Sequence, residues 1–158
     1  MSAAWARHQG SAESGLGARA VGYNAAYADR HARRRLPLSA EPIILDRRDG
    51  VAVVRVHGEH DVFTAPALRE QVHAAIEQSA PLVIDLSGAT FIDSSVLAVL
   101  LGGLRRAREA DLGYALILPG EEGAPVRRIF EVTGLVPVFA IQPSESEAVA
   151  AASAGVNA

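Results

Sequence analysis

Apolar residues follow two different spacings along the chain, and each spacing predicts one kind of element. Residues 82–86 form an almost continuous apolar run, which is typical of a strand buried inside a sheet. After Ser95 the apolar residues recur at helical spacing, at Leu97, Leu100, Leu101 and Leu104. That spacing predicts an amphipathic helix directly after the buried strand.

The same reasoning predicts a layered α/β domain with the element order ββαβαβαβα. Strands are expected at 43–45, 51–57, 82–86, 114–118 and 138–141, and helices at 64–78, 96–108, 124–133 and 144–152. Asp49-Gly50 predicts a hairpin turn between the first two strands, and Ser87-Gly88 predicts a turn after the third. Thr64 is expected to cap the first helix, with Pro66 in its first turn.

A small polar cluster, Asp93-Ser94-Ser95, stands between the buried strand and the following helix. Residues of these types cap helix N-termini, and most such caps carry no chemistry. The edge at which strands end and helices begin is also where α/β domains usually bind ligands or partners. The pattern alone therefore leaves two interpretations open, a helix cap only or a docking site.

Composition and charge narrow the class of protein. A chain of 158 residues with 49 % hydrophobic residues has room for one domain with a real core. It has no cysteine, which excludes disulfides and thiolate metal sites and fits a reducing compartment. No signal segment opens the chain, and its longest apolar stretch, 96–104, is too short to cross a bilayer, so we expect no membrane association and a cytoplasmic location.

The formal charge of −3 is unevenly distributed. Residues 1–40 carry six arginines against two acidic residues, whereas the rest of the chain carries nine arginines against sixteen acidic residues. An acidic domain offers no basic groove, so direct nucleic-acid binding is not expected. We interpret residues 1–41 as a disordered or weakly helical arm rich in arginine and alanine, with a basic docking tail as the alternative. Residues 153–158 are expected to form a flexible tail.

Three enzyme-like arrangements are weak. His57, Asp61 and Ser95 would have the residue types of a nucleophilic triad, but Ser95 lacks the Gly-x-Ser-x-Gly elbow. The acidic and histidine residues 57–61 have the types of metal ligands, yet on a strand His60 would point away from His57, Glu59 and Asp61. No phosphate-binding or dinucleotide glycine pattern is present, so neither an enzymatic activity nor a cofactor is expected.

Four stretches, considered together, resemble the STAS family, specifically the bacterial anti-sigma factor antagonists. They are Gly58-Glu59-His60-Asp61 with the helix start that follows, Val83-Ile84-Asp85-Leu86 with Phe91-Ile92-Asp93-Ser94-Ser95, the helical segment 101–108, and the closing segment 128–135. Each motif is short, and their order and spacing carry the resemblance, which covers residues 42–152.

The resemblance implies a single STAS-type domain, with helices packed on a mixed β-sheet, that acts as a protein-binding switch. Such antagonists bind an anti-sigma factor that is also a serine kinase and so release a sigma factor. The kinase phosphorylates the residue that corresponds to Ser95, and a metal-dependent serine phosphatase reverses the modification. The partner-binding residues that the resemblance implies are Glu59, Asp61, Thr64, Asp93, Ser94, Ser95 and Val96.

Two residues depart from the family pattern. Val96 stands where the family usually has glycine, and its stiff, branched side chain could slow or block a kinase. His60 stands where the family usually has an apolar residue; we interpret it as an exposed substitution, with a pH-sensitive contact as the alternative. The competing hypothesis is therefore a STAS module that binds another protein or a small ligand and is never phosphorylated.

Overall fold

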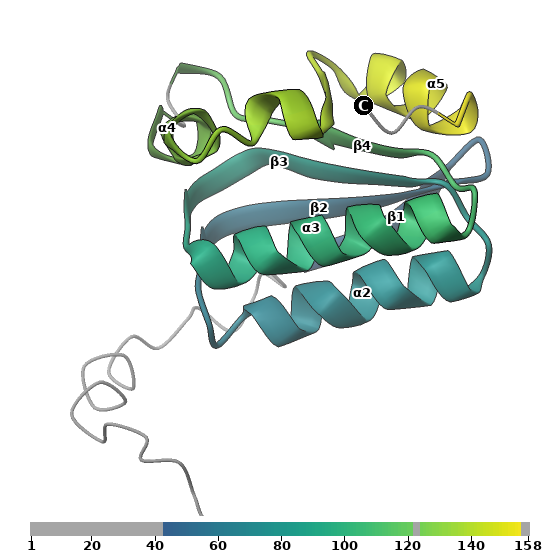
Figure 1. The fold of residues 1–158 in the computed structure, drawn as a ribbon, viewed down its shortest axis with the longest axis horizontal. Coiled ribbons are helices and arrows are strands. Elements are labelled where there is room, and N and C mark those ends of the chain that lie inside the picture. Colours follow the sequence, from purple (N-terminus) through teal and green to yellow (C-terminus); the bar gives the residue numbers. More distant parts are fainter. Residues whose placement is uncertain (1–42, 122–123, 156–158) are drawn as a thin grey trace, which may run out of the picture. The chain divides into compact units, whose positions relative to one another are not determined.

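The chain forms a five-stranded mixed β-sheet, seen in a computed structural model that describes residues 43–121 and 124–155 (Figure 1). The strands are β1 (Ile43–Arg48), β2 (Val51–His60), β3 (Leu82–Ile92), β4 (Tyr114–Ile117) and β5 (Ala140–Gln142). They lie in sequence order across the sheet; β1 pairs antiparallel with β2, and β2 to β5 run parallel. The predicted fold class and element order are confirmed.

Helices cover both faces of this sheet. The helices α2 (Ala65–Glu77) and α3 (Ser94–Glu109) lie side by side on one face (Figure 1), α4 (Ala124–Val132) joins the same core cluster through Val126 and Phe130, and α5 (Glu145–Ser153) covers the other face. The strand β2 shows why: Ala52, Val54 and Val56 join the core cluster beneath α2 and α3, whereas Val51 and Val53 join the cluster beneath α5. Successive side chains of a strand point to opposite faces, so an uninterrupted apolar strand requires a cover on both.

Two strands continue further than the sequence predicts. We expected the second strand to end at His57 and a turn at Ser87-Gly88, but β2 continues to His60 and β3 passes through both residues to Ile92. The pairing of β2 with β3 shifts register between Arg55 and His57, and again between Gly58 and Glu59. Because of these irregularities, the polar and glycine residues that suggested a turn are accommodated within the paired strands.

Smaller differences occur near the end of the domain. The strand expected at 138–141 begins only at Ala140, as β5, because Val138 still belongs to a 3-10 helix, η2 (Val136–Val138). Pro137 lacks the N–H that a strand ladder needs, which favours the turn. The arm at 1–41 lies outside the described residues, as do 122–123 and the tail residues 156–158.

Tyr114 supplies a test of the core. Its side chain is buried, burial raises the pKa of its phenol, and its hydroxyl has no hydrogen-bond partner among the described residues. Removing the hydroxyl as Tyr114→Phe therefore removes an uncompensated buried polar group, and we expect the free energy of unfolding to rise by about 1 kcal/mol. Urea unfolding measures this as a higher midpoint with an unchanged slope. A lower midpoint would show that the hydroxyl is satisfied in solution.

Candidate functional site

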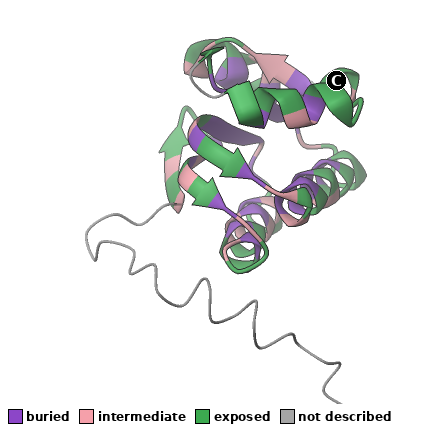
Figure 2. Ribbon diagram, turned by 90° about the vertical axis from the view of Figure 1, so that its left-hand side faces the viewer, coloured by how far each residue is buried: buried purple, intermediate pink, exposed green. Residues whose placement is uncertain are grey.

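The candidate site lies at the edge of the sheet where β2 and β3 end and α2 and α3 begin. We call residues 59–64 and 91–96 the site edge; Figure 2 looks onto the side of the domain on which both strands end. Parallel strands bring their carboxyl ends to one edge, so residues about 30 positions apart in sequence become neighbours there. This confirms the placement of the polar cluster Asp93-Ser94-Ser95 between a strand and a helix.

Asp93 connects the two halves of the site edge. Its Oδ1 accepts hydrogen bonds from the backbone N–H groups of Ser95 (2.8 Å) and Val96 (3.2 Å), which caps α3. Its Oδ2 accepts a third from the backbone N–H of Val62 in the β2–α2 loop (3.1 Å). One carboxylate thus satisfies orphan donors of the helix and fixes the loop beside it. Asp93 is both the cap and a structural member of the site.

The three residues after Asp93 occupy different environments. Ser94 is exposed, Ser95 is half-buried, and both lie in the first turn of α3. Val96, which the resemblance placed among the partner-binding residues, is completely buried in the core cluster. Its side chain packs inward because it occupies the apolar stripe of α3, so it offers no surface to a partner. That expectation about Val96 is corrected.

The β2–α2 loop is shaped by Asp61 and Thr64. Asp61 Oδ1 accepts a hydrogen bond from the backbone N–H of Phe63 (2.9 Å), and Thr64 Oγ1 accepts one from the backbone N–H of Asp61 (2.9 Å). Thr64 is the N-cap residue of α2 and Pro66 lies in the first turn, as predicted, but the Thr64 side chain makes no capping hydrogen bond. Its hydroxyl faces back into the loop. Both residues therefore act on the loop, and Thr64 does not cap the helix through its side chain.

His60 is buried, and the expectation that it is an exposed substitution was wrong. Only 1 % of the residue is accessible, and its ring lies within hydrogen-bond distance of two groups: Nε2 is 2.9 Å from the His57 carbonyl oxygen and Nδ1 is 3.2 Å from Thr64 Oγ1. Because β2 continues past His57, position 60 falls on the buried face of the strand. Burial lowers the pKa of His60, which favours the neutral ring.

The lowered pKa of His60 predicts a pH dependence of stability. The folded state binds a proton at His60 less readily than the unfolded chain, whose histidines titrate near pH 6.5. The free energy of unfolding should therefore fall as the pH falls through this value, towards the lower pKa of the folded state. Thermal unfolding at pH 7.5 and 5.0 measures the fall, which we expect to be smaller in His60→Gln. Equal falls in both proteins would contradict the assignment to His60.

Sequence analysis did not include three exposed apolar side chains of the site edge among the candidate partner-binding residues. Val62, Phe63 and Phe91 are 43 %, 44 % and 48 % exposed. Val62 and Phe63 lie in the loop between two polar residues, and Phe91 is paired in register with Glu59, which is also exposed. Large apolar side chains that gather on a surface are typical of protein interaction sites. The sequence did contain a signal for two of them, because Val62 and Phe63 are adjacent apolar residues inside an otherwise polar turn.

The enzyme-like arrangements find no support in the geometry. Among the described residues, no hydrogen bond joins His57, Asp61 and Ser95 to one another. Within the same part of the chain, no group of three or more His, Cys, Asp or Glu side chains could hold a metal ion.

The helices of the described residues include none with the length and apolar character that a membrane span requires.

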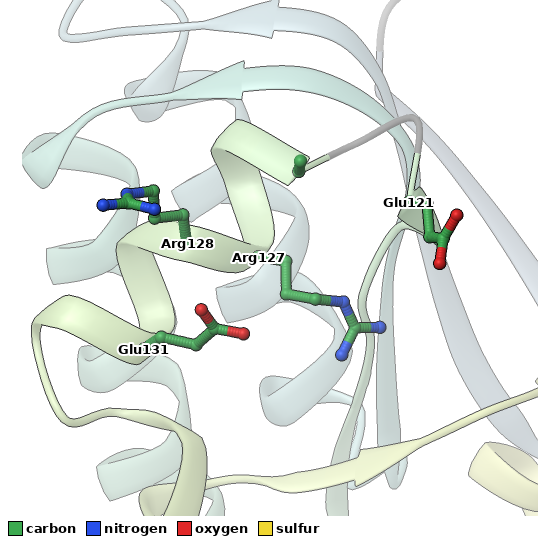
Figure 3. A pocket seen from close by; sticks show the side chains of 6 residues that line it. Glu121, Arg127, Arg128 and Glu131 are labelled. Atoms are coloured by element: carbon green, nitrogen blue, oxygen red, sulfur yellow. The ribbon is translucent and has the colours of Figure 1, made fainter.

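A shallow hollow of about 380 Å³ lies elsewhere, beside α4. Its charged lining comes from Glu121, Arg127, Arg128 and Glu131 (Figure 3). The Arg127 guanidinium donates hydrogen bonds from Nε (3.2 Å) and from a terminal nitrogen (3.0 Å) to the Pro119 carbonyl oxygen. Arg127 is thus engaged with the backbone, and the hollow contains none of the residues of the site edge.

Replacing Asp93 tests whether one carboxylate serves both halves of the site edge. Asp93→Ala removes the cap and should lower the free energy of unfolding by about 1–2 kcal/mol. In Asp93→Asn the amide oxygen is able to cap α3, but the amide nitrogen cannot accept the Val62 N–H, so the stability loss should be smaller. Hydrogen exchange at Val62 should accelerate in both variants. A protected Val62 amide in Asp93→Asn would contradict the assignment.

Comparison with known proteins identifies the class to which this fold and site belong. Residues 42–148 match the family described as STAS domain, and the chain belongs to that family. Its relatives include the anti-sigma F factor antagonist of Paenibacillus polymyxa, 31 % identical over 67 % of this chain and 90 % of the relative. The chain is thus related to the anti-sigma factor antagonists of this family. These antagonists are regulators without enzymatic activity.

Solved structures agree with this assignment. The crystal structure of an anti-sigma factor antagonist from Mycobacterium paratuberculosis is 35 % identical, covers 73 % of this chain and 99 % of that chain, and superposes with a TM-score of 0.62. The structure of the Bacillus protein SpoIIAA in its unphosphorylated form is 25 % identical, covers 68 % of this chain and 92 % of that chain, and has a TM-score of 0.58.

Proposed function

We propose that this protein binds an anti-sigma factor with serine kinase activity, releases a sigma factor by doing so, and is switched off by phosphorylation of Ser95. The anti-sigma factor antagonists among its relatives support the class of partner. The arrangement of the site edge supports the position of the switch, because Ser95 stands in the first turn of α3, which Asp93 caps, beside an exposed, partly apolar loop.

The geometry at Ser95 carries the proposal. Ser95 is half-buried in the first turn of α3, where the helix dipole favours an added anion, although Asp93 already accepts the N–H groups of Ser95 and Val96. A phosphoryl group brings about −1.5 to −2 charges next to the Asp93 carboxylate. It therefore changes the charge and bulk of the docking surface while the helix still accommodates it. We propose that release comes from bulk and from repulsion against an acidic partner surface.

The proposed docking surface combines polar and apolar side chains. Glu59, Asp61, Thr64 and Ser94 provide its polar groups, as the resemblance implies, and the exposed side chains Val62, Phe63 and Phe91 add apolar area. Exposed aromatic residues often provide much of the binding energy of protein interfaces. A metal-dependent serine phosphatase would restore the binding state, and the exchange would take place in the cytoplasm.

Intact mass tests the proposal. The purified protein is mixed with each candidate anti-sigma kinase of its host and ATP, beside Ser95→Ala and the matched control Ser94→Ala. We expect one added phosphate in the native protein and in Ser94→Ala, and none in Ser95→Ala. Binding of a kinase without any added phosphate would favour the module that is never phosphorylated. If no kinase binds, the anti-sigma proposal is wrong.

A further inference from the structure

We propose that His60 is a positioning residue for the site edge, and that its protonation releases the loop that holds Val62 against Asp93. The proposal begins from the hydrogen bonds of a buried ring in the β2–α2 connection. Among the described residues, the hydrogen-bond partners of His60 are Thr64 and His57, and Ser95 is not one of them. His60 acts through Thr64 and Asp61, which shape the loop on which Val62 lies.

The two ring nitrogens of neutral His60 have fixed roles. The His57 carbonyl oxygen can only accept, so Nε2 carries the proton and donates to it over 2.9 Å. Nδ1 then accepts a hydrogen bond from the Thr64 hydroxyl over 3.2 Å. The Thr64 oxygen in turn accepts the backbone N–H of Asp61 over 2.9 Å. The neutral ring thereby sets the direction of its own two hydrogen bonds and of the Thr64 hydroxyl.

Protonation at Nδ1 reverses one of these bonds. Thr64 Oγ1 must then accept from the ring as well as from the Asp61 N–H, and its own proton must turn to the Asp61 carbonyl oxygen, 3.2 Å away. The ring also acquires a full charge at a position that is only 1 % exposed. A charge without water or a carboxylate bonded to it is costly in such a place, and the exposed loop is the part that is able to open and admit water.

The surrounding charges do not remove this cost. Asp61 follows His60 directly and attracts a positive ring, but its carboxylate binds the backbone N–H of Phe63 and is not hydrogen-bonded to the imidazole. His57, on the same strand, repels a positive ring. The carboxylate across the loop, Asp93 at the start of α3, is held by three backbone N–H groups. Opening the loop would break the bond from Val62 to Asp93.

For function, this inference rests on the proposed role of the site edge in partner binding. Val62 and Phe63 lie in the loop that His60 holds, and Asp93 connects that loop to the turn that carries Ser95. Acidification would therefore weaken partner binding without phosphorylation. The structural part of the inference concerns the isolated protein and is testable without any partner.

A pH titration followed by NMR tests the structural part. We compare the native protein with His60→Gln, which removes the titrating ring, and with His57→Gln as a matched control that removes the neighbouring histidine. Between pH 8 and 5 ordinary carboxylates stay ionised, so the titrations report histidine. In the native protein and in His57→Gln, the Val62 amide should shift with the same midpoint as the His60 ring, and in His60→Gln it should stay constant. A constant Val62 amide in the native protein, or a shift that survives in His60→Gln, would overturn the proposal.

Partner affinity at pH 7.5 and 5.0 tests the regulatory consequence. We expect the native protein to lose at least about fivefold more affinity on acidification than His60→Gln does. The difference between the two proteins cancels any titration of the partner itself. Equal losses would overturn the regulatory role of His60. A partner that binds neither protein at either pH would contradict the proposed function, while the NMR titration would still decide the role of His60 in the loop.

Discussion

Replacing Ser95 by aspartate should weaken binding of the anti-sigma factor by about 30-fold or more while leaving the melting temperature within about 2 °C of the native value. The loss in affinity follows from the proposed docking surface, because a charge buried in an interface without a partner costs about 2 kcal/mol or more. The stability should hardly change, because Ser95 lies in the first turn of α3, where an acidic side chain is favourable. Calorimetry of binding and thermal unfolding of the two proteins measure the two effects.

Two controls define what Ser95→Asp reports. Ser94→Asp adds the same charge at the neighbouring exposed position, and a smaller effect on affinity is expected there because Ser94 is less enclosed. Ser95→Asn adds similar bulk without charge and separates the two causes of release. A fall of many degrees in the melting temperature of Ser95→Asp would mean that phosphorylation acts by unfolding the domain. Our explanation of release would then be wrong.

Replacing Gly113 by alanine should lower the free energy of unfolding by about 3 kcal/mol, although it adds only one methyl group. A Cβ at this position would lie 1.9 Å from the carbonyl oxygen of Ala152 in α5. The obstructing atom belongs to the backbone of α5, so it cannot move without moving the helix. Gly113 is also held in place, because its carbonyl accepts the Leu82 N–H over 2.9 Å. The helix α5 would have to move off the sheet, exposing the cluster around Ala148 and Val149.

Gly102→Ala is the matched control for Gly113→Ala. Nothing lies within 4 Å of an added Cβ at Gly102, which stands inside α3. Alanine there should increase stability by up to about 1 kcal/mol, because glycine is a poor helix former. Thermal unfolding should show Gly113→Ala melting on the order of 10 °C below the native protein and Gly102→Ala slightly above it. Similar melting temperatures for the two variants would mean that α5 is less firmly seated than described.

Sequence analysis predicted the elements well where one periodicity extended over the whole element. The apolar run at 82–86 and the helical spacing after Ser95 both appear in the structure as expected, and Asp93 caps α3. These features depend on neighbours in the sequence. The continuation of β3 past Ser87 depends instead on pairing with β2, with register shifts that no local pattern specifies.

The candidate site was predicted in position but not in its contacts. The residue types around Asp93 indicated the edge of the sheet, yet the bond to Val62 joins segments about 30 residues apart and could not be read from either. The burial of His60 was missed because the strand was ended too early, at His57. Likewise, Thr64 has the residue type of a helix cap, but its hydroxyl is engaged by the backbone of the loop.

The unequal lengths of the central strands have a consequence for how such a domain diverges. Within the described residues, β3 pairs with both neighbours only as far as Asp85, and beyond it the site-bearing end has only β2 as a partner. The two strand ends and their loops form a two-stranded ribbon whose inner face, with Ala89 and Ile92, belongs to the core and whose outer side chains are exposed. Substitutions of its exposed side chains, such as Val62, Phe63 and Phe91, should alter partner recognition at little cost to folding, so one scaffold is able to acquire new specificities while its interior stays constant.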